Sequence, residues 1–235
     1  LFIDEIQECP RAVTALRYFY EEMPNLHVIA AGSLLEFVLH GKGAEVDFPV
    51  GRVRSIYMYP FSFMEYLRAV EGEMIADYLE KFQVGHQENT AHDRLIEAYK
   101  TFLVVGGMPE AVLTYMTTGS LLECQQVHRD IIFNFMDDFN KYSKNVSADI
   151  IRKVFEYSIH NVCGQTKASS AISGVSAYYF EKSIELLHRA GLVYPVKASG
   201  CTVLPLGVTE KEHNKKLIVF DTGVYLTECG LDVGE

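Results

Sequence analysis

The chain opens with an apolar run, Leu1–Phe2–Ile3, that ends in two adjacent carboxylates, Asp4 and Glu5. Such a run is typical of a buried strand in a parallel sheet, because helices cover both faces of these sheets. Ligands of open α/β sheets bind at the carboxyl ends of the strands, which is where both acids would lie. The alternative is a buried strand that ends in an ordinary surface turn, since short motifs often match by chance.

A second apolar run, residues 26–31, follows a predicted helix that begins at Pro10, a residue suited to the first helical position. Strand, helix and strand at this spacing predict a βαβ unit. The acid pair then has the Walker B pattern, in which Asp4 helps to bind Mg²⁺ and Glu5 orients or deprotonates the attacking water. The phosphate-binding motif G-x-x-x-x-G-K-[ST] is absent from the sequence. We therefore expect a fragment of a longer parent that binds ATP and Mg²⁺, with half of the nucleotide site present.

Ser33 follows the second apolar run and has two interpretations. A small polar residue at the tip of the neighbouring strand can sense the γ-phosphate and the water in a Walker-type ATPase. Ser33 and Glu36 also have the S-x-x-E spacing of a capping box, which alone explains the serine.

Arg52 precedes a predicted third strand, residues 54–59, which Pro60 would end. An arginine here can reach a γ-phosphate as a finger, within one subunit or across an interface. A surface ion pair with a nearby acid such as Asp47 is the alternative, and the sequence slightly favours it.

From residue 63 to residue 142 the pattern is helical. Capping boxes at Ser62 and Ser120 predict helices over 63–82 and from 121 onward, and further helices are predicted over 92–104 and from Pro109. Asp137 and Asp138 would be metal ligands only with a further histidine or acid beside them, so a solvated helix end is the better interpretation.

Residues 146–208 have the order of a winged helix. Ser147 caps a first helix, 167–172 is a predicted short helix, and a longer helix ends at Ala190–Gly191 with a glycine C-cap. A strand over 192–196 and its return over 201–206 would form the wing. The longer helix would lie in a DNA major groove, but its region carries few basic residues, so DNA, a protein partner and a structural lid all stay open.

The formal net charge of −10 disfavours broad, unspecific binding to nucleic acid. The five cysteines form no C-x-x-C pair, which indicates a reducing, cytoplasmic environment. No apolar stretch is long enough to cross a bilayer. Near the end, Asp221 precedes a short predicted helix and is better explained as its N-cap than as a lone catalytic acid.

Six segments together resemble the prokaryotic AAA-type ATPases that carry a winged helix and a C-terminal restriction-nuclease-like domain. These segments are Leu-Phe-Ile-Asp-Glu-Ile-Gln-Glu-Cys-Pro, Val-Ile-Ala-Ala-Gly-Ser, Pro-Val-Gly-Arg-Val, Tyr-Pro-Phe-Ser-Phe-Met-Glu-Tyr-Leu, Gly-Gly-Met-Pro-Glu-Ala-Val and Val-Phe-Asp-Thr-Gly-Val.

The resemblance implies Walker B roles for Asp4 and Glu5, the sensor position for Ser33 and the post-sensor arginine for Arg52. It implies that a P-loop precedes Leu1 and that a nuclease-like core begins near Leu217. The expected fold class is α/β plus α. The expected domains are a partial P-loop ATPase sheet over 1–62, a helical region over 63–145, a winged helix over 146–208 and the start of the nuclease-like domain over 209–235.

Overall fold

The computed structural model describes residues 1–32, 49–82, 91–142, 146–169, 171–200 and 204–231, and the chain divides into two compact units, 1–58 and 59–235. Each unit is described by itself. Within the described residues no helix is both long and apolar enough to cross a membrane.

The first unit contains the predicted strand–helix–strand. β1 (Phe2–Ile3) pairs in parallel with β2 (Ile29–Ala30), and η1 (Ile6–Glu8) and α1 (Pro10–Glu22) connect them. Pro10 stands in the first turn of α1, as the sequence predicts. The parallel pairing is confirmed, although both strands are shorter than expected.

The burial expected for the opening strand is not found. The side chains of Phe2 and Ile29, which face each other in register, are 64% and 65% exposed. The buried apolar residues in the described part of this unit include Ile6 and Val13, at 2% and 1% exposure, and Pro49. Among the described residues, two paired strands and one helix provide too little surface to cover both faces of the sheet, and Ile6 and Val13 are buried where η1 contacts α1.

The predicted strand over 54–59 is wrong, because these residues have no regular secondary structure. Ile56 and Met58 are 80% and 93% exposed. A strand requires a partner for its backbone hydrogen bonds, and within the described residues no strand pairs with this segment.

The second unit begins with helices. Ser62 forms the predicted capping box with Glu65, whose Oε2 accepts the Ser62 backbone N–H at 2.8 Å. The single helix expected over 63–82 is divided in two, because Gly72 has φ 94° and ends the helical path. The helices are α3 (Phe63–Val70), α4 (Glu73–Glu80), α5 (His92–Val105), α6 (Pro109–Thr118) and α7 (Leu121–Tyr142).

Four of these helices, α3, α5, α6 and α7, share an apolar core. Tyr66 of α3, Val105 of α5 and Val112 of α6 are buried together with Cys124 of α7. Phe61 and Phe102 pack against this cluster from its edge. The strong desolvation raises the pKa of the Tyr66 phenol and of the Cys124 thiol, so both groups are uncharged packing residues here.

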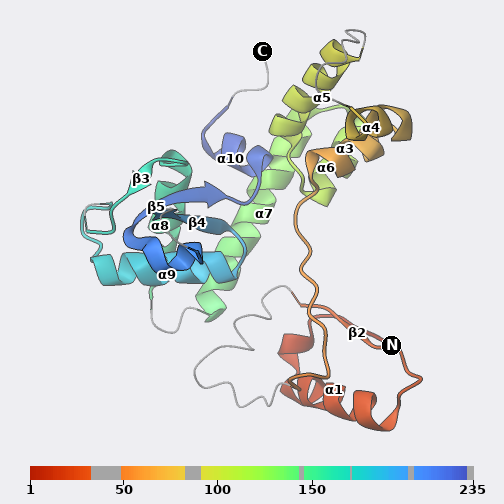
Figure 1. Ribbon diagram of the computed structural model, residues 1–235, viewed down its shortest axis with the longest axis vertical. Helices are drawn as coiled ribbons and strands as arrows, with labels where there is room; N and C mark the ends of the chain where they lie inside the picture. Colours follow the sequence, from red (N-terminus) through yellow and green to blue (C-terminus); the bar gives the residue numbers. More distant parts are fainter. Residues whose placement is uncertain (33–48, 83–90, 143–145, 170, 201–203, 232–235) are drawn as a thin grey trace. The chain divides into compact units, whose positions relative to one another are not determined.

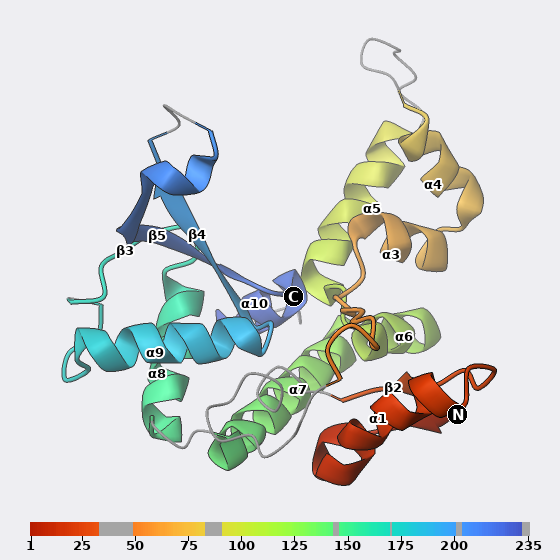
Figure 2. The ribbon, with the colours of Figure 1, turned by 60° about the horizontal axis from the view of Figure 1, so that its bottom comes forward.

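The remainder of the unit is a three-stranded antiparallel sheet packed on two helices (Figure 2). α8 and α9 contribute buried Ile151, Phe155, Phe180 and Leu187, and β5 contributes Leu217. In chain order the elements are α8 (Ala148–His160), β3 (Gln165–Thr166), α9 (Ala177–Arg189), β4 (Val193–Ser199), η2 (Leu206–Thr209), β5 (Glu210–Val219) and α10 (Thr222–Glu228), and the order of strands in the sheet is β3-β5-β4.

The end of α9 follows the sequence prediction closely. Gly191 has φ 73°, its N–H donates to the carbonyl oxygen of His188, and the N–H of Leu192 donates to that of Leu187. This pair of bonds is the Schellman motif, and the buried side chains of Leu187 and Leu192 accompany it.

Two expectations around this sheet are corrected. The short helix expected over 167–172 is absent from its described residues, which form turns and bends. Small polar side chains such as Ser169 compete for backbone hydrogen bonds and favour turns. The return strand was expected over 201–206; its described residues, 204–206, contain no strand, and the strand that pairs along β4 is β5, residues 210–219.

Candidate nucleotide site

Asp4 and Glu5 lie directly after β1, at the carboxyl end of the parallel pair, and both are exposed. The N–H of Ala31 donates to the carbonyl oxygen of Ile3 at 2.8 Å, and the N–H of Ile6 donates to that of Ala31 at 3.0 Å. In a regular parallel ladder the second donor would be Glu5. The chain therefore contains one additional residue at this point, and the acid pair stands on a bulge between two ladder hydrogen bonds.

Glu5 has a backbone conformation that is unusual for its residue type. Its φ and ψ are 46° and 47°, in the left-handed region, which costs a residue with a Cβ about 1 kcal/mol or more. Its freed N–H donates to Asp4 Oδ1 at 3.1 Å. This bond holds the Asp4 carboxylate against the backbone of the turn, and strain of this kind is found most often at functional sites.

Gln7 is the residue of this site that sequence reasoning did not single out. Its amide Nε2 donates to Glu5 Oε2, while its side chain is only 9% exposed. Its Oε1 is buried and has no hydrogen-bond partner among the residues that the structure describes. The available signal was a glutamine directly after the apolar Ile6. A buried amide requires hydrogen-bond partners, and the adjacent acids could supply them.

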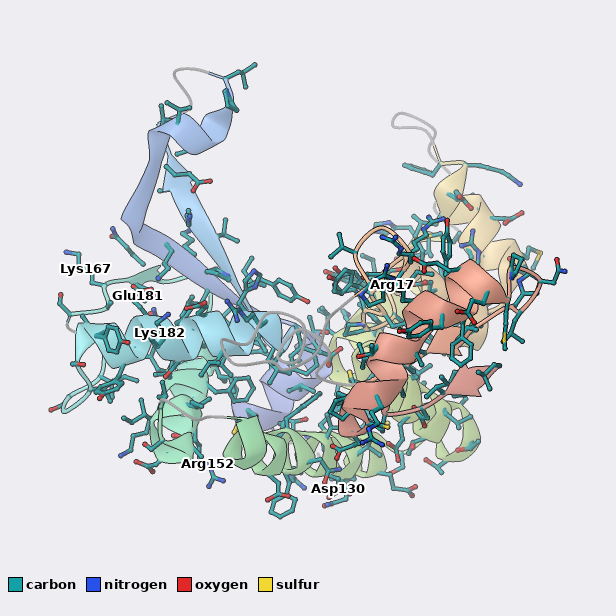
Figure 3. All side chains as sticks on the ribbon, turned by 90° about the horizontal axis from the view of Figure 1, so that it is seen from below. Arg17, Asp130, Arg152, Lys167, Glu181 and Lys182 are labelled. Carbon is teal, nitrogen blue, oxygen red and sulfur yellow. The ribbon has the colours of Figure 1, made fainter. Side chains whose placement is uncertain are left out.

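Arg52 lies in the same unit and forms a surface ion pair, as one of its two interpretations predicts, with Glu21 as the acid. Its Nε and its Nη2 are each 3.0 Å from Glu21 Oε1 on α1, and its Nη1 donates to the carbonyl oxygen of Val50. Arg17, labelled in Figure 3, approaches the same Oε1 at 3.1 Å. Desolvation alone would raise the pKa of Glu21, but the hydrogen bonds and charges of Arg17 and Arg52 outweigh it and lower that pKa.

The remaining candidates are placed as follows. Ser33, Glu36 and Asp47 lie outside the described residues. Asp137 is exposed near the end of α7, and no cluster of three or more metal-ligating side chains occurs in the described part of the chain. A surface hollow in the first unit is lined by α1 residues, including Pro10, Thr14 and Tyr18, and does not include the acid pair.

Asp221 is the N-cap that the sequence predicts, and it also makes a second contact. It is 5% exposed, its Oδ1 accepts the N–H of Val224 at 2.9 Å, and its Oδ2 accepts the N–H of Gly107 at 2.7 Å. Both carboxylate oxygens are therefore occupied inside the second unit, so Asp221 has a structural role here.

Comparison with family models gives the class of the first unit. Residues 1–67 match the model described as an AAA domain, which covers the βαβ unit, the acid pair and Arg52. Proteins of this type use ATP, generally with Mg²⁺. The first unit is thus similar to an AAA domain.

The second match identifies the family of the chain as a whole. Residues 96–233 match the model described as a domain of unknown function (DUF8612), which spans more than half of the sequence. The chain belongs to that family. Neither description names a winged helix or a nuclease. A search of curated proteins gave no match.

Proposed function

We propose that this chain supplies the Walker B half of an Mg²⁺-dependent ATP hydrolysis site. The observation that carries the proposal is the placement of Asp4 and Glu5 at the carboxyl end of β1, inside the segment that matches an AAA domain. Asp4 binds Mg²⁺, and Glu5 orients or deprotonates the attacking water. Ser33 positions that water from the end of the second strand.

Gln7 holds the carboxylate of Glu5 through its amide. The buried position of Gln7 fixes that amide, because the side chain has little freedom inside η1. In this proposal Gln7 is a positioning residue that keeps the Glu5 carboxylate oriented toward the water.

Arg52 neutralises the negative charge that develops on the γ-phosphate, after it leaves Glu21. The Arg52–Glu21 pair is compatible with this role because the two side chains are 40% and 37% exposed. An exposed ion pair contributes about 0–1 kcal/mol, which a phosphate contact readily replaces.

The proposal is tested in the full-length protein that contains this chain, because the printed sequence has no P-loop motif. Glu5→Gln is expected to lower ATP turnover by about 10²-fold or more, the usual cost of losing a general base. Asp4→Asn is expected to raise the Mg²⁺ concentration required for turnover. Glu8→Gln, which changes an exposed acid of the same segment, is the matched control. Equal turnover in the Glu5→Gln and Glu8→Gln variants would refute the assignment.

A second function concerns residues 148–219, and we infer that they form a winged helix. The chain order of α8, β3, α9, β4 and β5, with strand order β3-β5-β4, supports this inference. In such a unit α9 would be the recognition helix.

The charges on α9 favour a protein partner over DNA. Glu185 bridges both exposed cations of the helix, at 2.7 Å from Lys182 Nζ and 2.7 Å from an Nη atom of Arg189. Lys215 pairs with Glu181, and Figure 3 shows Lys167, Glu181 and Lys182 near one end of the helix. Tyr178 is 64% exposed on the same helix, and tyrosine is enriched at protein interfaces.

A titration of the full-length protein with duplex DNA at two salt concentrations separates the partners. We expect no salt-dependent binding, since few phosphates would be neutralised. Binding that weakens steeply with salt and that strengthens in a Glu185→Gln variant would assign the helix to DNA instead.

A further inference from the structure

The second unit begins with the segment Tyr59–Ser62, called here the linking segment because it continues directly from Met58 of the first unit. The N–H of Phe61 donates to the carbonyl oxygen of Gly107 at 2.7 Å. A Cβ on Gly107 would lie 2.2 Å from the carbonyl oxygen of Phe61 and 2.7 Å from its nitrogen. This approach of two backbones requires glycine, so the linking segment is fixed at the turn between α5 and α6.

The same glycine is held by Asp221. The N–H of Gly107 donates to Asp221 Oδ2 at 2.7 Å, across 114 residues of sequence, while Oδ1 accepts the N–H of Val224 in α10. Gly106 has φ 71°, and a Cβ there would lie 2.3 Å from Asp221 Oδ1. A continuous series of hydrogen bonds therefore runs from Phe61 through Gly107 and Asp221 to α10.

α10 packs against a buried residue of α7. His128 of α7 is fully buried, with Nε2 3.0 Å from the carbonyl oxygen of Val105 and Nδ1 2.9 Å from Thr227 Oγ1. A Cβ on Gly223 would lie 2.6 Å from His128 Cε1. α10 also lies beside α5 and α7 in Figure 1. Close packing of this kind shifts between discrete arrangements rather than deforming continuously.

We propose that Asp221 is a coupling residue, which passes movement of the linking segment to α10 and to β5, the strand that ends just before it. Its two carboxylate oxygens bind Gly107 and Val224, which lie far apart in the sequence. Neither oxygen is available for chemistry. The source of the movement rests on the proposed function, because nucleotide binding and hydrolysis in the first unit would displace the linking segment. The series of hydrogen bonds itself does not depend on nucleotide.

Amide hydrogen exchange in the full-length protein tests this proposal, and the first measurement is made without nucleotide. Asp221→Asn keeps the size of the side chain and one acceptor for the Val224 N–H, but its NH₂ group cannot accept from Gly107. We expect amide exchange in residues 59–66 to rise about tenfold in this variant, because the opening free energy of the segment falls. Unchanged exchange there would overturn the coupling role, whether or not the protein hydrolyses ATP.

The second arm adds a non-hydrolysable ATP analogue. In the wild type we expect exchange in residues 222–228 to change about threefold or more on binding, and in Asp221→Asn we expect that response to be lost. The coupling is contradicted if this change in exchange persists in Asp221→Asn. It is also contradicted if the wild type hydrolyses ATP through Glu5 and exchange in α10 does not change. If the Glu5→Gln variant hydrolyses ATP as fast as the wild type, the proposed function is wrong instead. The two failures are therefore distinguishable.

Gly107→Ala provides an independent disruption if Asp221→Asn fails to fold. Its Cβ would push the Phe61 backbone away, so it should reproduce the faster exchange in residues 59–66. Gly207→Ala is the matched control, since among the described residues its Cβ would meet Glu210 Oε1 at 3.9 Å, an ordinary contact. Equal exchange in the two glycine variants would overturn the proposal.

Discussion

The backbone N–H of Ile6 donates to the carbonyl oxygen of Ala31 at 3.0 Å, which continues the β1–β2 pairing beyond the two acids. Asp4 and Glu5 are therefore anchored on both sides, by Ile3 before them and by Ile6 after them. Because Ile6 is buried, this anchor is protected from water. The backbone that carries the two acids is therefore fixed, which the proposed Mg²⁺ site would require.

Arg52→Ala is expected to lower ATP turnover of the full-length protein by at least about 10²-fold, because an arginine that meets the transferring phosphate contributes strongly. Arg17→Ala is the matched control, since it removes the other partner of Glu21 and leaves Arg52 in place. Each change should alter the unfolding free energy by less than about 1 kcal/mol. If both variants retain full turnover, Arg52 is only a surface partner of Glu21.

Ser62→Ala is expected to cost about 1 kcal/mol of unfolding free energy, because it removes both hydrogen bonds of the Ser62 hydroxyl, the one accepted from the Glu65 N–H and the one donated to Glu65 Oε2. Ser147→Ala is a matched comparison, since Ser147 is also an N-cap but makes no side-chain capping bond. We expect a clearly smaller effect there. Urea unfolding measures both variants, and equal losses would show that the Ser62 box does not stabilise the helix.

His128 is expected to make the second unit sensitive to acid. Burial lowers its pKa below the ordinary 6.5, and the opposing influences of Asp221 and of the Val105 carbonyl oxygen do not offset this. The neutral ring fits the site, because Nε2–H donates to Val105 and Nδ1 accepts from Thr227. Its contribution to stability is therefore complete above about pH 6.5 and is lost as the pH falls below that value, where the unfolded chain binds the proton more readily.

Urea unfolding at pH 7.5 and pH 5.5 checks this prediction. The wild type should lose more unfolding free energy between the two values than a His128→Gln variant, while His92→Gln, at an exposed histidine, should behave like the wild type. Identical pH dependence in the wild type and His128→Gln would contradict the assignment.

Local rules in the sequence predicted much of the fold. Pro10, the Ser62 box, Pro109 and the glycine after α9 each mark a helix end through bonds within a few residues, and the structure places helix ends there. The break at Gly72 was missed, because the apolar spacing continues through it and only its positive φ ends α3.

Contacts between distant segments could not be predicted in the same way. The structure pairs Arg52 with Glu21, 31 residues earlier, while the nearby Asp47 lies outside the described residues. Asp221 was predicted as a cap, but its bond to Gly107 depends on how α5, α6 and α10 pack. The strand expected over 54–59 has suitable residues, yet a strand also requires a neighbouring edge, which sequence spacing does not reveal.

The rate of ATP hydrolysis in a single turnover, with ATP already bound to the full-length protein, tests the role of the acid pair most directly. Binding is then separated from chemistry, so the rate reports on the hydrolysis step in which Glu5 would act. The account predicts that Glu5→Gln binds ATP with nearly unchanged affinity and hydrolyses it about 10²-fold or more slowly than Glu8→Gln. Equal single-turnover rates in these two variants would contradict it.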